Sequence, residues 1–315
     1  MSDALAIAAC ALIAVGIGSN DTSNALGICI GCGIISFRRA VAYFAVLVLI
    51  GIIVQGDKVM STVGKDLVAV NTAMLGPALG VSACLIIISN WKKIPLSTHQ
   101  VIIGSLVGAG AAIERQPDYT RLAEILFSWV ISPLVACAMS HLLYRAMERT
   151  LSKFPLFRIE RILRNLLLLS GGLIAYNTGA NELATVLGPV IHSGLSDRLH
   201  ASLLGCLLVF VGAYFISYRV VETVGKGITA LDPYTGFAAQ FGAGCCVLLF
   251  TFLGMPVSTT YCVIGAISGV GLVKGMETVK APLVRKILFN WILAPSLAFI
   301  LCYLLVKGPA LPALM

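Results

Sequence analysis

The sequence predicts an all-α polytopic membrane protein with two inverted-topology repeats of about five spans each, in which discontinuous helices and hairpins meet at mid-membrane. Three observations predict this fold: an apolar composition, motifs that recur at a constant offset, and an odd number of apolar tracts per repeat. Of the 315 residues, 58% are hydrophobic and 11% are charged, and the mean hydropathy is +0.96. A soluble domain has roughly 25% charged residues, so this chain lacks the polar side chains to cover a water-exposed surface.

Several short motifs occur twice along the chain, in the same order. The residue numbers of the matched motifs differ by 161 in three cases, for example 179 − 18, and by 162 in a fourth. An offset that holds over most of the chain indicates a duplicated unit of about 160 residues. The matched pairs are Gly18–Gly27 with Gly179–Gly188, Thr62–Lys65 with Thr223–Lys226, Ile94–Gly110 with Met255–Gly271, and Trp129–Pro133 with Trp291–Pro295.

Each unit contains five apolar tracts, which are the predicted spans. Because five is odd, the second unit enters the membrane from the opposite side, as in the inverted repeats of many secondary transporters. We expect residues 1–143 to form the first repeat, 144–165 a basic cytoplasmic linker and 166–315 the second repeat. Thr62–Lys65 and its copy fall at tract edges, where we expect them to anchor loops. The tracts are about 4–35, 41–55, 67–89, 94–112 and 122–143, then 166–195, 201–218, 228–254, 255–273 and 287–306.

The distribution of basic residues predicts the orientation in the membrane. With the N-terminus outside, the cytoplasmic side holds 16 lysines and arginines and the outer side holds 6, which accounts for all 22. This positive-inside bias favours a multi-pass protein of the plasma (inner) membrane with both termini outside, and the short loops fit a prokaryotic protein. The linker mixes basic and hydrophobic residues, so we expect a helix on the inner membrane surface and no nucleic-acid site.

The stretch GSNDTSNALG, residues 18–27, places polar residues inside the first apolar tract. As one helix, the tract from Ala4 to Ile35 would be about 48 Å long, whereas the bilayer core is about 30 Å thick. Gly18 and Asn20 have poor helix propensity, which favours a break near the motif over a steep tilt. Non-helical backbone at this depth requires protein groups or trapped water to satisfy it.

The polar groups of this stretch recur in the second unit and indicate a cation site. A carboxylate in the membrane is costly and marks a functional site by default. Carboxylate, amide and hydroxyl oxygens suit a hard cation such as Na⁺, and Glu182 is an alternative proton carrier. The simpler alternative is that the asparagines only hydrogen-bond neighbouring helices. The matching residues are Asn20, Asp21 and Asn24 in the first unit and Asn181, Glu182 and Thr185 in the second.

A second repeated motif predicts an anion site. In PLSTH and PVSTT, a proline followed by hydroxyl residues opens an apolar, glycine-spaced run, which is typical of a helix that starts inside the membrane. An open helix N-terminus attracts anions, and two such ends can converge on one oxyanion. Two ordinary capped spans are the alternative. His99 fits a proton carrier, an oxyanion donor or a structural hydrogen bond. The predicted anion-binding residues are Ser97, Thr98, His99, Ser258, Thr259 and Thr260.

The two motifs together favour a cation-coupled anion symporter. No lysine or arginine lies deep within a predicted span, so helix dipoles and bound cations must balance the anion. An anion channel would need a continuous polar stripe along several spans. An enzyme would need a nucleophile or a metal cluster, so we predict no catalytic residues, no enzymatic activity and no cofactor beyond the coupling ion.

At these motifs the sequence resembles the inorganic phosphate transporter (PiT) family of sodium/phosphate symporter-like proteins, whose members carry a duplicated G-A-N-D-x-x-N-A signature and a P-[VL]-S-T-T hairpin in each half. The resemblance covers nearly the whole chain. It implies Na⁺-coupled or H⁺-coupled phosphate import by alternating access, in a homodimer within the lipid bilayer. It also implies that the hairpin serines and threonines hold phosphate and that the signature residues bind cations. Those residues are Asn20, Asp21, Ser23, Asn24, Asn181, Glu182 and Thr185, with Asp21, Glu182, Asn20 and Asn181 as Na⁺ ligands.

Four residues depart from the family pattern. Ser19 replaces alanine, Glu182 replaces aspartate and Thr185 replaces asparagine in the signatures, and His99 replaces threonine in the first hairpin. Because some similar proteins move sulfate, a sulfate permease of the same fold is the alternative to phosphate.

Overall fold

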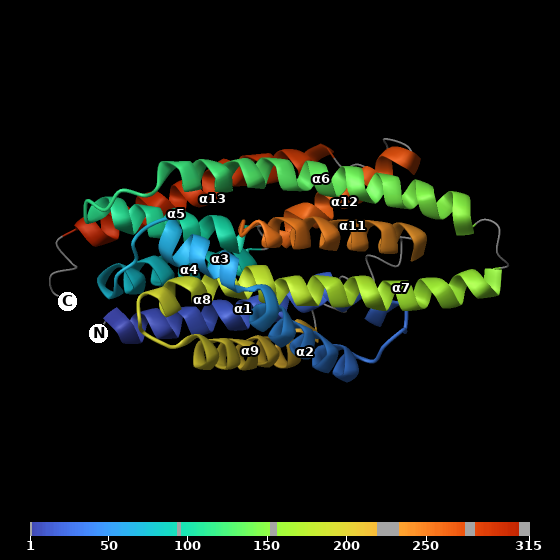
Figure 1. Ribbon diagram of the computed structural model, residues 1–315, viewed down its shortest axis with the longest axis horizontal. Coiled ribbons are helices and arrows are strands. Elements are labelled where there is room, and N and C mark those ends of the chain that lie inside the picture. The colour runs from blue at the N-terminus through green and yellow to red at the C-terminus, as the bar shows by residue number, and fades with distance from the viewer. Residues whose placement is uncertain (1, 93–95, 152–155, 219–232, 275–280, 309–315) are drawn as a thin grey trace.

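The computed structural model describes residues 2–92, 96–151, 156–218, 233–274 and 281–308, and within these ranges the chain is helical with no strand. Most of the long helices lie side by side along one axis of an elongated molecule (Figure 1). The first repeat contains α1 (Ser2–Gly31), α2 (Phe37–Gln55), α3 (Asp57–Ser61), the π-helical turn η1 (Thr62–Asp66), α4 (Thr72–Trp91), α5 (Thr98–Ala112) and α6 (Tyr119–Leu151). The second contains α7 (Leu156–Asn177), the π-helical turn η2 (Thr178–Leu183), α8 (Ala184–His192), α9 (Arg198–Phe215), α11 (Pro233–Phe252), α12 (Thr259–Lys274) and α13 (Ala281–Lys307).

The helices match the predicted tracts in both halves when α7, η2 and α8 are counted as one. Seven helices of the described residues are long and apolar enough to cross a membrane. The helices α5 and α12 have 15 and 16 residues, so each is only about 23 Å long, less than the roughly 30 Å of a bilayer core. Their length fits helices that begin part-way through the membrane.

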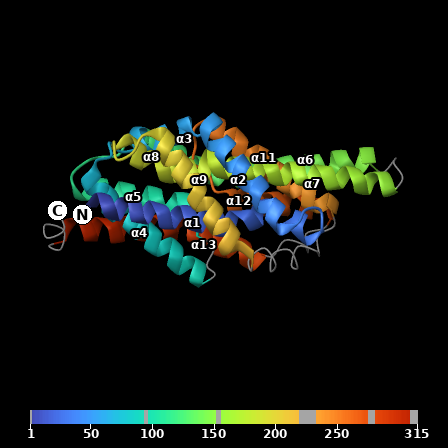
Figure 2. The same ribbon diagram turned by 90° about the horizontal axis from the view of Figure 1, so that it is seen from below.

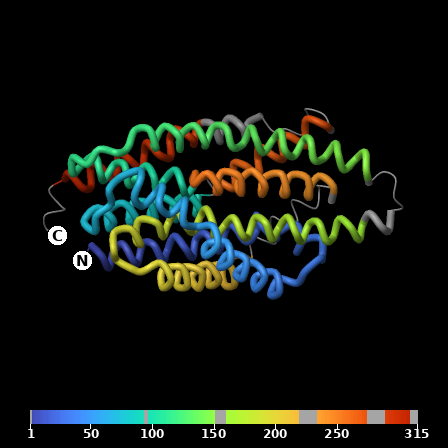
Figure 3. The backbone as a smooth tube through the Cα atoms, in the orientation of Figure 1, coloured from blue at the N-terminus to red at the C-terminus, as the bar shows by residue number. Residues whose placement is uncertain are grey.

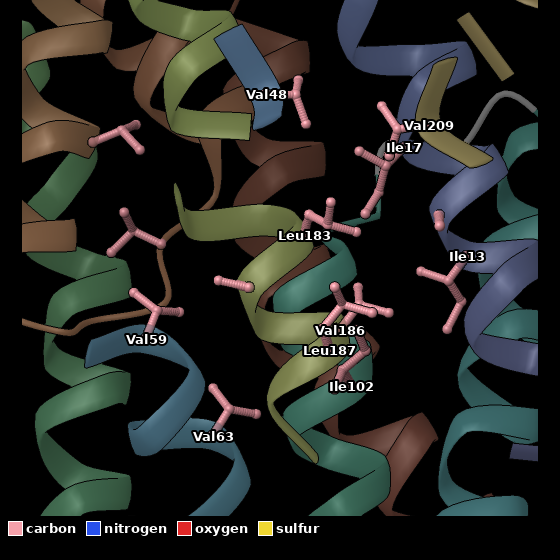
Figure 4. Packing of buried hydrophobic residues seen from close by; sticks show 14 of the residues in the cluster. Ile13, Ile17, Val48, Val59, Val63, Ile102, Leu183, Val186, Leu187 and Val209 are labelled. Carbon is pink, nitrogen blue, oxygen red and sulfur yellow. The ribbon is translucent and has the colours of Figure 1, made fainter. Parts of the chain in front are cut away.

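The predicted break near Gly18–Gly27 is wrong for the first repeat, because α1 runs without interruption through the motif. The hydroxyl groups bond within the helix: Ser19 donates to the Gly16 carbonyl at 2.9 Å, Thr22 to Gly18 at 2.7 Å and Ser23 to Asn20 at 2.6 Å. These polar groups are therefore satisfied without unwinding. In the second repeat the matching stretch does depart from α-helix, as the π-helical turn η2. Aliphatic side chains of α1, α5 and α8 gather around this segment, among them Ile17, Ile102 and Val186 (Figure 4).

The predicted surface helix over residues 144–165 is also not observed. Residues 144–151 continue α6 and residues 156–165 begin α7, and these two helix ends project beyond the bundle along its axis (Figure 1). Likewise, Thr62–Lys65 forms part of the helical turn η1 instead of a loop edge. Its copy at Thr223–Lys226 lies outside the described residues.

Corresponding helices of the two repeats run in opposite directions. In Figure 3 the chain of α1 runs left to right and that of α7 to α8 runs right to left; α6 and α13 are opposed in the same way. The start of α1 and the end of α13 share one end of the molecule, and the end of α6 and start of α7 lie at the other (Figure 1).

Each repeat packs into the other through matched glycines. The helices α1 and α9 lie across one another (Figure 2), and a Cβ at Gly18 would overlap the Val209 carbonyl. In the other half a Cβ at Gly179 would overlap the Val48 carbonyl. The second contact repeats the first, because Gly179 is the counterpart of Gly18 and Val48 is the counterpart of Val209, each at an offset of 161 (179 − 18 and 209 − 48). The duplicated sequence therefore makes duplicated contacts, which place the two signatures at equivalent points of the bundle.

Candidate substrate and ion site

The tips of the two hairpins meet on a single side chain of the second signature. Helix α5 begins after Ser97 and helix α12 begins at Thr259. From the first tip, the His99 Nε2 lies 2.8 Å from the Asn181 Oδ1. From the second tip, the Val257 backbone N–H donates to the same oxygen at 3.1 Å. The structure therefore brings the two helix N-termini together, as their sequences predict.

Asn181 is fully buried and uses its amide group completely. Its Nδ2 donates to the Thr251 Oγ1 at 2.8 Å and to the Met255 carbonyl at 3.0 Å, while its Oδ1 faces His99 and Val257. The Asn181 side chain therefore joins the two hairpins in this conformation, and its role as a Na⁺ ligand stays a prediction.

The two signature carboxylates lie near each other. Asp21 and Glu182 stand 161 positions apart, are 5% and 6% exposed, and are near enough to act on each other electrostatically. Asn24 donates to the Asp21 Oδ1 at 3.3 Å, and the buried Asp21 Oδ2 has no protein partner among the described residues. No ion pair of the described chain involves either carboxylate. Two adjoining buried carboxylates require a cation or a proton between them, and this pair can supply ligands to either.

A second pair of equivalent residues meets close to the hairpin tips. The Tyr261 hydroxyl donates to the Gln100 Oε1 at 3.3 Å, and these residues are also 161 positions apart. Equivalent residues touch each other only where two related units face across a common axis. The Asp21–Glu182 and Gln100–Tyr261 pairs therefore mark the line along which the repeats meet.

The other predicted residues are distributed around this centre. Ser97, Ser258 and Thr259 are buried, and the Ser97 Oγ and Thr259 Oγ1 lack a partner among the described residues. Thr98 and Thr260 are partly exposed. The remaining signature hydroxyls, on Ser23 and Thr185, donate to helix carbonyls of their own segments, at 2.6 and 2.8 Å respectively.

Asn20 lies apart from the hairpin junction. It is partly exposed, and its Nδ2 donates to the Asn90 Oδ1 on α4 at 3.1 Å. Asn90 is the counterpart of Thr251 at the same 161-residue offset (251 − 90). Each signature asparagine thus donates to the equivalent helix of its own repeat.

Sequence reasoning missed four of these positions. Gln100 and Tyr261 lie inside a matched pair of motifs but received no predicted role, and Asn90 and Thr251 belong to no motif. The repeat offset pairs Gln100 with Tyr261 and Asn90 with Thr251, which is a usable signal. Trp129 belongs to a matched motif without a predicted role in the site, and its Nε1 donates to the Pro256 carbonyl at 2.8 Å and so holds the second hairpin against α6.

An all-helical chain of two related units, with apolar spanning helices around a buried polar centre, defines the class of membrane transporters. The family model described as the phosphate transporter family matches residues 17–157 and again 153–302. A protein of Methanocaldococcus jannaschii named as a phosphate permease is 34% identical over 92% of each chain. The chain therefore belongs to the phosphate transporter family.

Two further comparisons bear on the substrate and the fold. A sulfate permease of Bacillus subtilis is 28% identical and covers 93% of this chain and 84% of its own. The solved structure of a sodium-dependent phosphate transporter matches the whole of both chains with a TM-score of 0.88 at 22% identity. The second likeness shows that the fold is that of a transporter of known structure.

Proposed function

We propose that the protein is a secondary active transporter that imports inorganic phosphate together with a cation, with Na⁺ as the preferred coupling ion and H⁺ as the alternative. One observation carries this proposal: the tips of two hairpins, one from each repeat, bond to one buried amide beside two neighbouring carboxylates. Free N–H groups at the start of α5 and α12 favour an anion there.

The carboxylate pair supplies the physical reason for coupling. Bare carboxylates at Asp21 and Glu182 would repel an oxyanion, and the described chain places no lysine or arginine in an ion pair with them. A cation bound between the carboxylates weakens their repulsion of the anion, because it cancels one of the two negative charges. Binding of the two ions is therefore mutually favourable, which is the thermodynamic requirement for symport.

The same geometry supports an inverted repeat that works by alternating access. Corresponding helices run in opposite directions, and equivalent residues meet at the centre. Asn20 is partly exposed where Asn181 is fully buried, so the two halves differ in how tightly they close. If the first half became tightly closed while the second half opened, the central site would face the opposite side of the membrane. Alternation between these two states would open the site to each membrane face in turn.

Phosphate is the first candidate substrate and sulfate the second. The family and the relative from M. jannaschii support phosphate. The B. subtilis relative, at a lower identity of 28%, is named for sulfate. An anion channel is a third and weaker candidate, because the polar residues gather at one centre instead of lining a path.

Orientation and assembly complete the proposal. The start of α1 and the end of α13 share one end of the molecule, which supports termini on the same side of the membrane. The distribution of basic residues supports the outer side of the plasma membrane for the termini and a cytoplasmic α6–α7 connection. The family resemblance supports a homodimer. Reporter fusions at the termini and cross-linking in native membranes test these two points.

The decisive experiment is uptake of labelled phosphate and labelled sulfate into proteoliposomes, with Na⁺ and pH gradients imposed separately. We expect phosphate to accumulate when the Na⁺ gradient is inward, and not under the pH gradient alone. Accumulation of neither anion under either gradient would refute the transport function, and accumulation of sulfate alone would transfer it to the second candidate.

A further inference from the structure

The histidine of the first hairpin stands where the second hairpin has threonine. His99 is the second residue of α5, is 1% exposed, and corresponds to Thr260 (260 − 99 = 161). Its imidazole has two nitrogens, and the structure gives them different surroundings. Nε2 lies on Asn181, whereas the buried Nδ1 has no protein partner among the described residues.

The partners of Asn181 determine which way its amide points. Its Nδ2 lies 3.0 Å from the Met255 carbonyl, which only accepts, and its Oδ1 lies 3.1 Å from the Val257 N–H, which only donates. If the amide were turned around, its NH₂ group would face the Val257 N–H, which is also a donor. Its oxygen would face the Met255 carbonyl, which is also an acceptor. Such an arrangement leaves both backbone groups without a hydrogen bond, which is unfavourable inside the helix bundle. The Oδ1 therefore faces His99.

This orientation decides the tautomer of His99. Because the Asn181 Oδ1 can only accept, the His99 Nε2 at 2.8 Å must carry the hydrogen and donate it. In the neutral ring, the Nδ1 then has a lone pair and no hydrogen. Glu182 lies near enough to act on the ring electrostatically, but no described carboxylate makes an ion pair with it. A buried, unpaired imidazolium is costly, so the ring is neutral.

We propose that the Nδ1 of His99 accepts a hydrogen bond from the hydroxyl group of protonated phosphate, and so selects phosphate over sulfate. This inference rests on the proposed function and names the residue that sets its substrate class. The Ser97 Oγ and Thr259 Oγ1, also buried and without a described partner, belong to the same pair of hairpin tips. A hydroxyl can donate to any oxyanion oxygen, whereas a bare Nδ1 can bond only to an anion that carries a hydrogen.

The chemistry of the two anions gives the direction and size of the effect. Monohydrogen and dihydrogen phosphate carry P–OH groups, and sulfate at neutral pH has only acceptor oxygens. A sulfate oxygen in the same place would set its lone pairs against that of Nδ1 and leave the nitrogen unsatisfied. A hydrogen bond involving a charged partner contributes enough for a selectivity of about 10-fold to 100-fold.

A matched pair of variants separates this role from a structural one. In His99→Gln, the side-chain amide reaches the Nε2 position, so it keeps the bond to Asn181 but removes the acceptor at Nδ1. In His99→Asn, the shorter amide lies near the Nδ1 position, so it keeps an acceptor there but loses the bond to Asn181. A structural histidine predicts near-normal selectivity for His99→Gln, and a selective histidine predicts near-normal selectivity for His99→Asn.

The measurement is how strongly each of four unlabelled anions inhibits the uptake of labelled phosphate into proteoliposomes. Phosphate and arsenate carry a hydroxyl, whereas sulfate and fluorophosphate, in which fluorine replaces the hydroxyl, carry none at neutral pH. For the wild type we expect the first two to compete at least tenfold more strongly than the last two. In His99→Gln this ratio should fall about tenfold, with phosphate binding weakened, while His99→Asn should keep most of the ratio.

Each other outcome counts against the inference. An unchanged ratio in His99→Gln, or equal competition by all four anions in the wild type, overturns it while phosphate transport stands. Uptake of sulfate but not phosphate by the wild type overturns it and moves the proposed function to its second candidate. Uptake of neither anion by the wild type refutes both this inference and the proposed function. Thermal unfolding of each variant in detergent confirms that the compared proteins are folded.

Discussion

Asn20 and Asn181 occupy equivalent places in the two repeats but have very different surroundings. Each donates from its Nδ2 to the matching helix of its own repeat, Asn20 to Asn90 and Asn181 to Thr251. Asn181 has no exposed surface and three more hydrogen bonds, which reach both hairpins. Asn20 is partly exposed, and its bond to Asn90 is its one side-chain bond among the described residues.

The difference shows that a duplicated sequence need not adopt two equal conformations. We call the surroundings of Asn181 the closed junction, because both hairpin tips bond to its side chain. We call those of Asn20 the open junction, because no hairpin tip bonds to its side chain among the described residues. One substitution between the hairpins accounts for part of this asymmetry. The imidazole of His99 reaches across to the asparagine of the other repeat, and no described contact of the shorter Thr260 does so. The bond to His99 therefore favours the closed state of the second junction over that of the first.

The largest effect is expected where the repeats are most alike, at the neighbouring carboxylates. Asp21→Asn and Glu182→Gln each remove a charge that a coupling cation needs, so we expect each to lower Na⁺-driven phosphate uptake by roughly 100-fold or more. The measurement is the initial rate of uptake into proteoliposomes under an inward Na⁺ gradient.

Glu182→Asp is the matched control, since it keeps the carboxylate and shortens the arm to the length found in the family signature. It should retain a substantial rate. Near-normal uptake by both amide variants would show that these carboxylates do not bind the coupling cation.

A smaller effect, on stability, should separate the closed junction from the open one. Asn181→Ala leaves groups of His99, Val257 and Met255 without a partner, and each costs about 1–3 kcal/mol, so we expect a loss of at least about 3 kcal/mol. Asn20→Ala loses one partly exposed bond and should cost less than about 1 kcal/mol. Chemical unfolding in detergent, followed by tryptophan fluorescence, measures both.

Equal losses in the two variants would mean that the two junctions are equally closed in solution. The difference between Asn20 and Asn181 would then belong to one conformation only, of a protein whose two repeats are equivalent on average. Repeating the measurement with saturating phosphate and Na⁺ sharpens the test, because ligands that bind the folded protein raise its stability with the logarithm of their concentration above Kd.

Much of the site follows from the repeat alone. The offset of 161 residues predicts that Asp21 pairs with Glu182, and the hairpin motifs predict helix starts at Ser97 and Ser258. These predictions work because a duplicated chain must reuse its contacts, as the matched glycine contacts of α1 and η2 show.

The conformation of each signature could not be predicted in the same way. Local propensity favours a break at Gly18–Gly27, but tertiary packing overrides it: Gly18 lies against the backbone of α9, and Ser19 and Thr22 bond to carbonyls of their own helix. The neutral tautomer of His99 depends on Met255 and Val257, which are more than 150 positions away in the chain. No local pattern contains that information.

The smallest predicted effect compares the first residues of two equivalent helices, α2 and α9. Asp197 caps α9, since its carboxylate accepts from the Leu199 and His200 N–H groups, each at 3.1 Å. Ser36 stands 161 positions earlier and makes no such side-chain bond at the start of α2. The bonds to His200 and Leu199 hold the pKa of the Asp197 carboxyl below its usual value.

The pKa of Asp197 is lower in the folded protein than in the unfolded protein. The cap therefore contributes its full stability to the folded protein above the unfolded pKa, and this stability is lost as the pH falls through the folded pKa. Asp197→Ala should therefore lower the melting temperature slightly at neutral pH and not at strongly acidic pH, whereas Ser36→Ala should leave it unchanged. Asp197→Asn keeps the cap without a titrating group and should show no such pH dependence. A pH-independent loss in Asp197→Ala would mean that the side chain stabilises α9 by packing, and that the two helix starts differ less than their hydrogen bonds suggest.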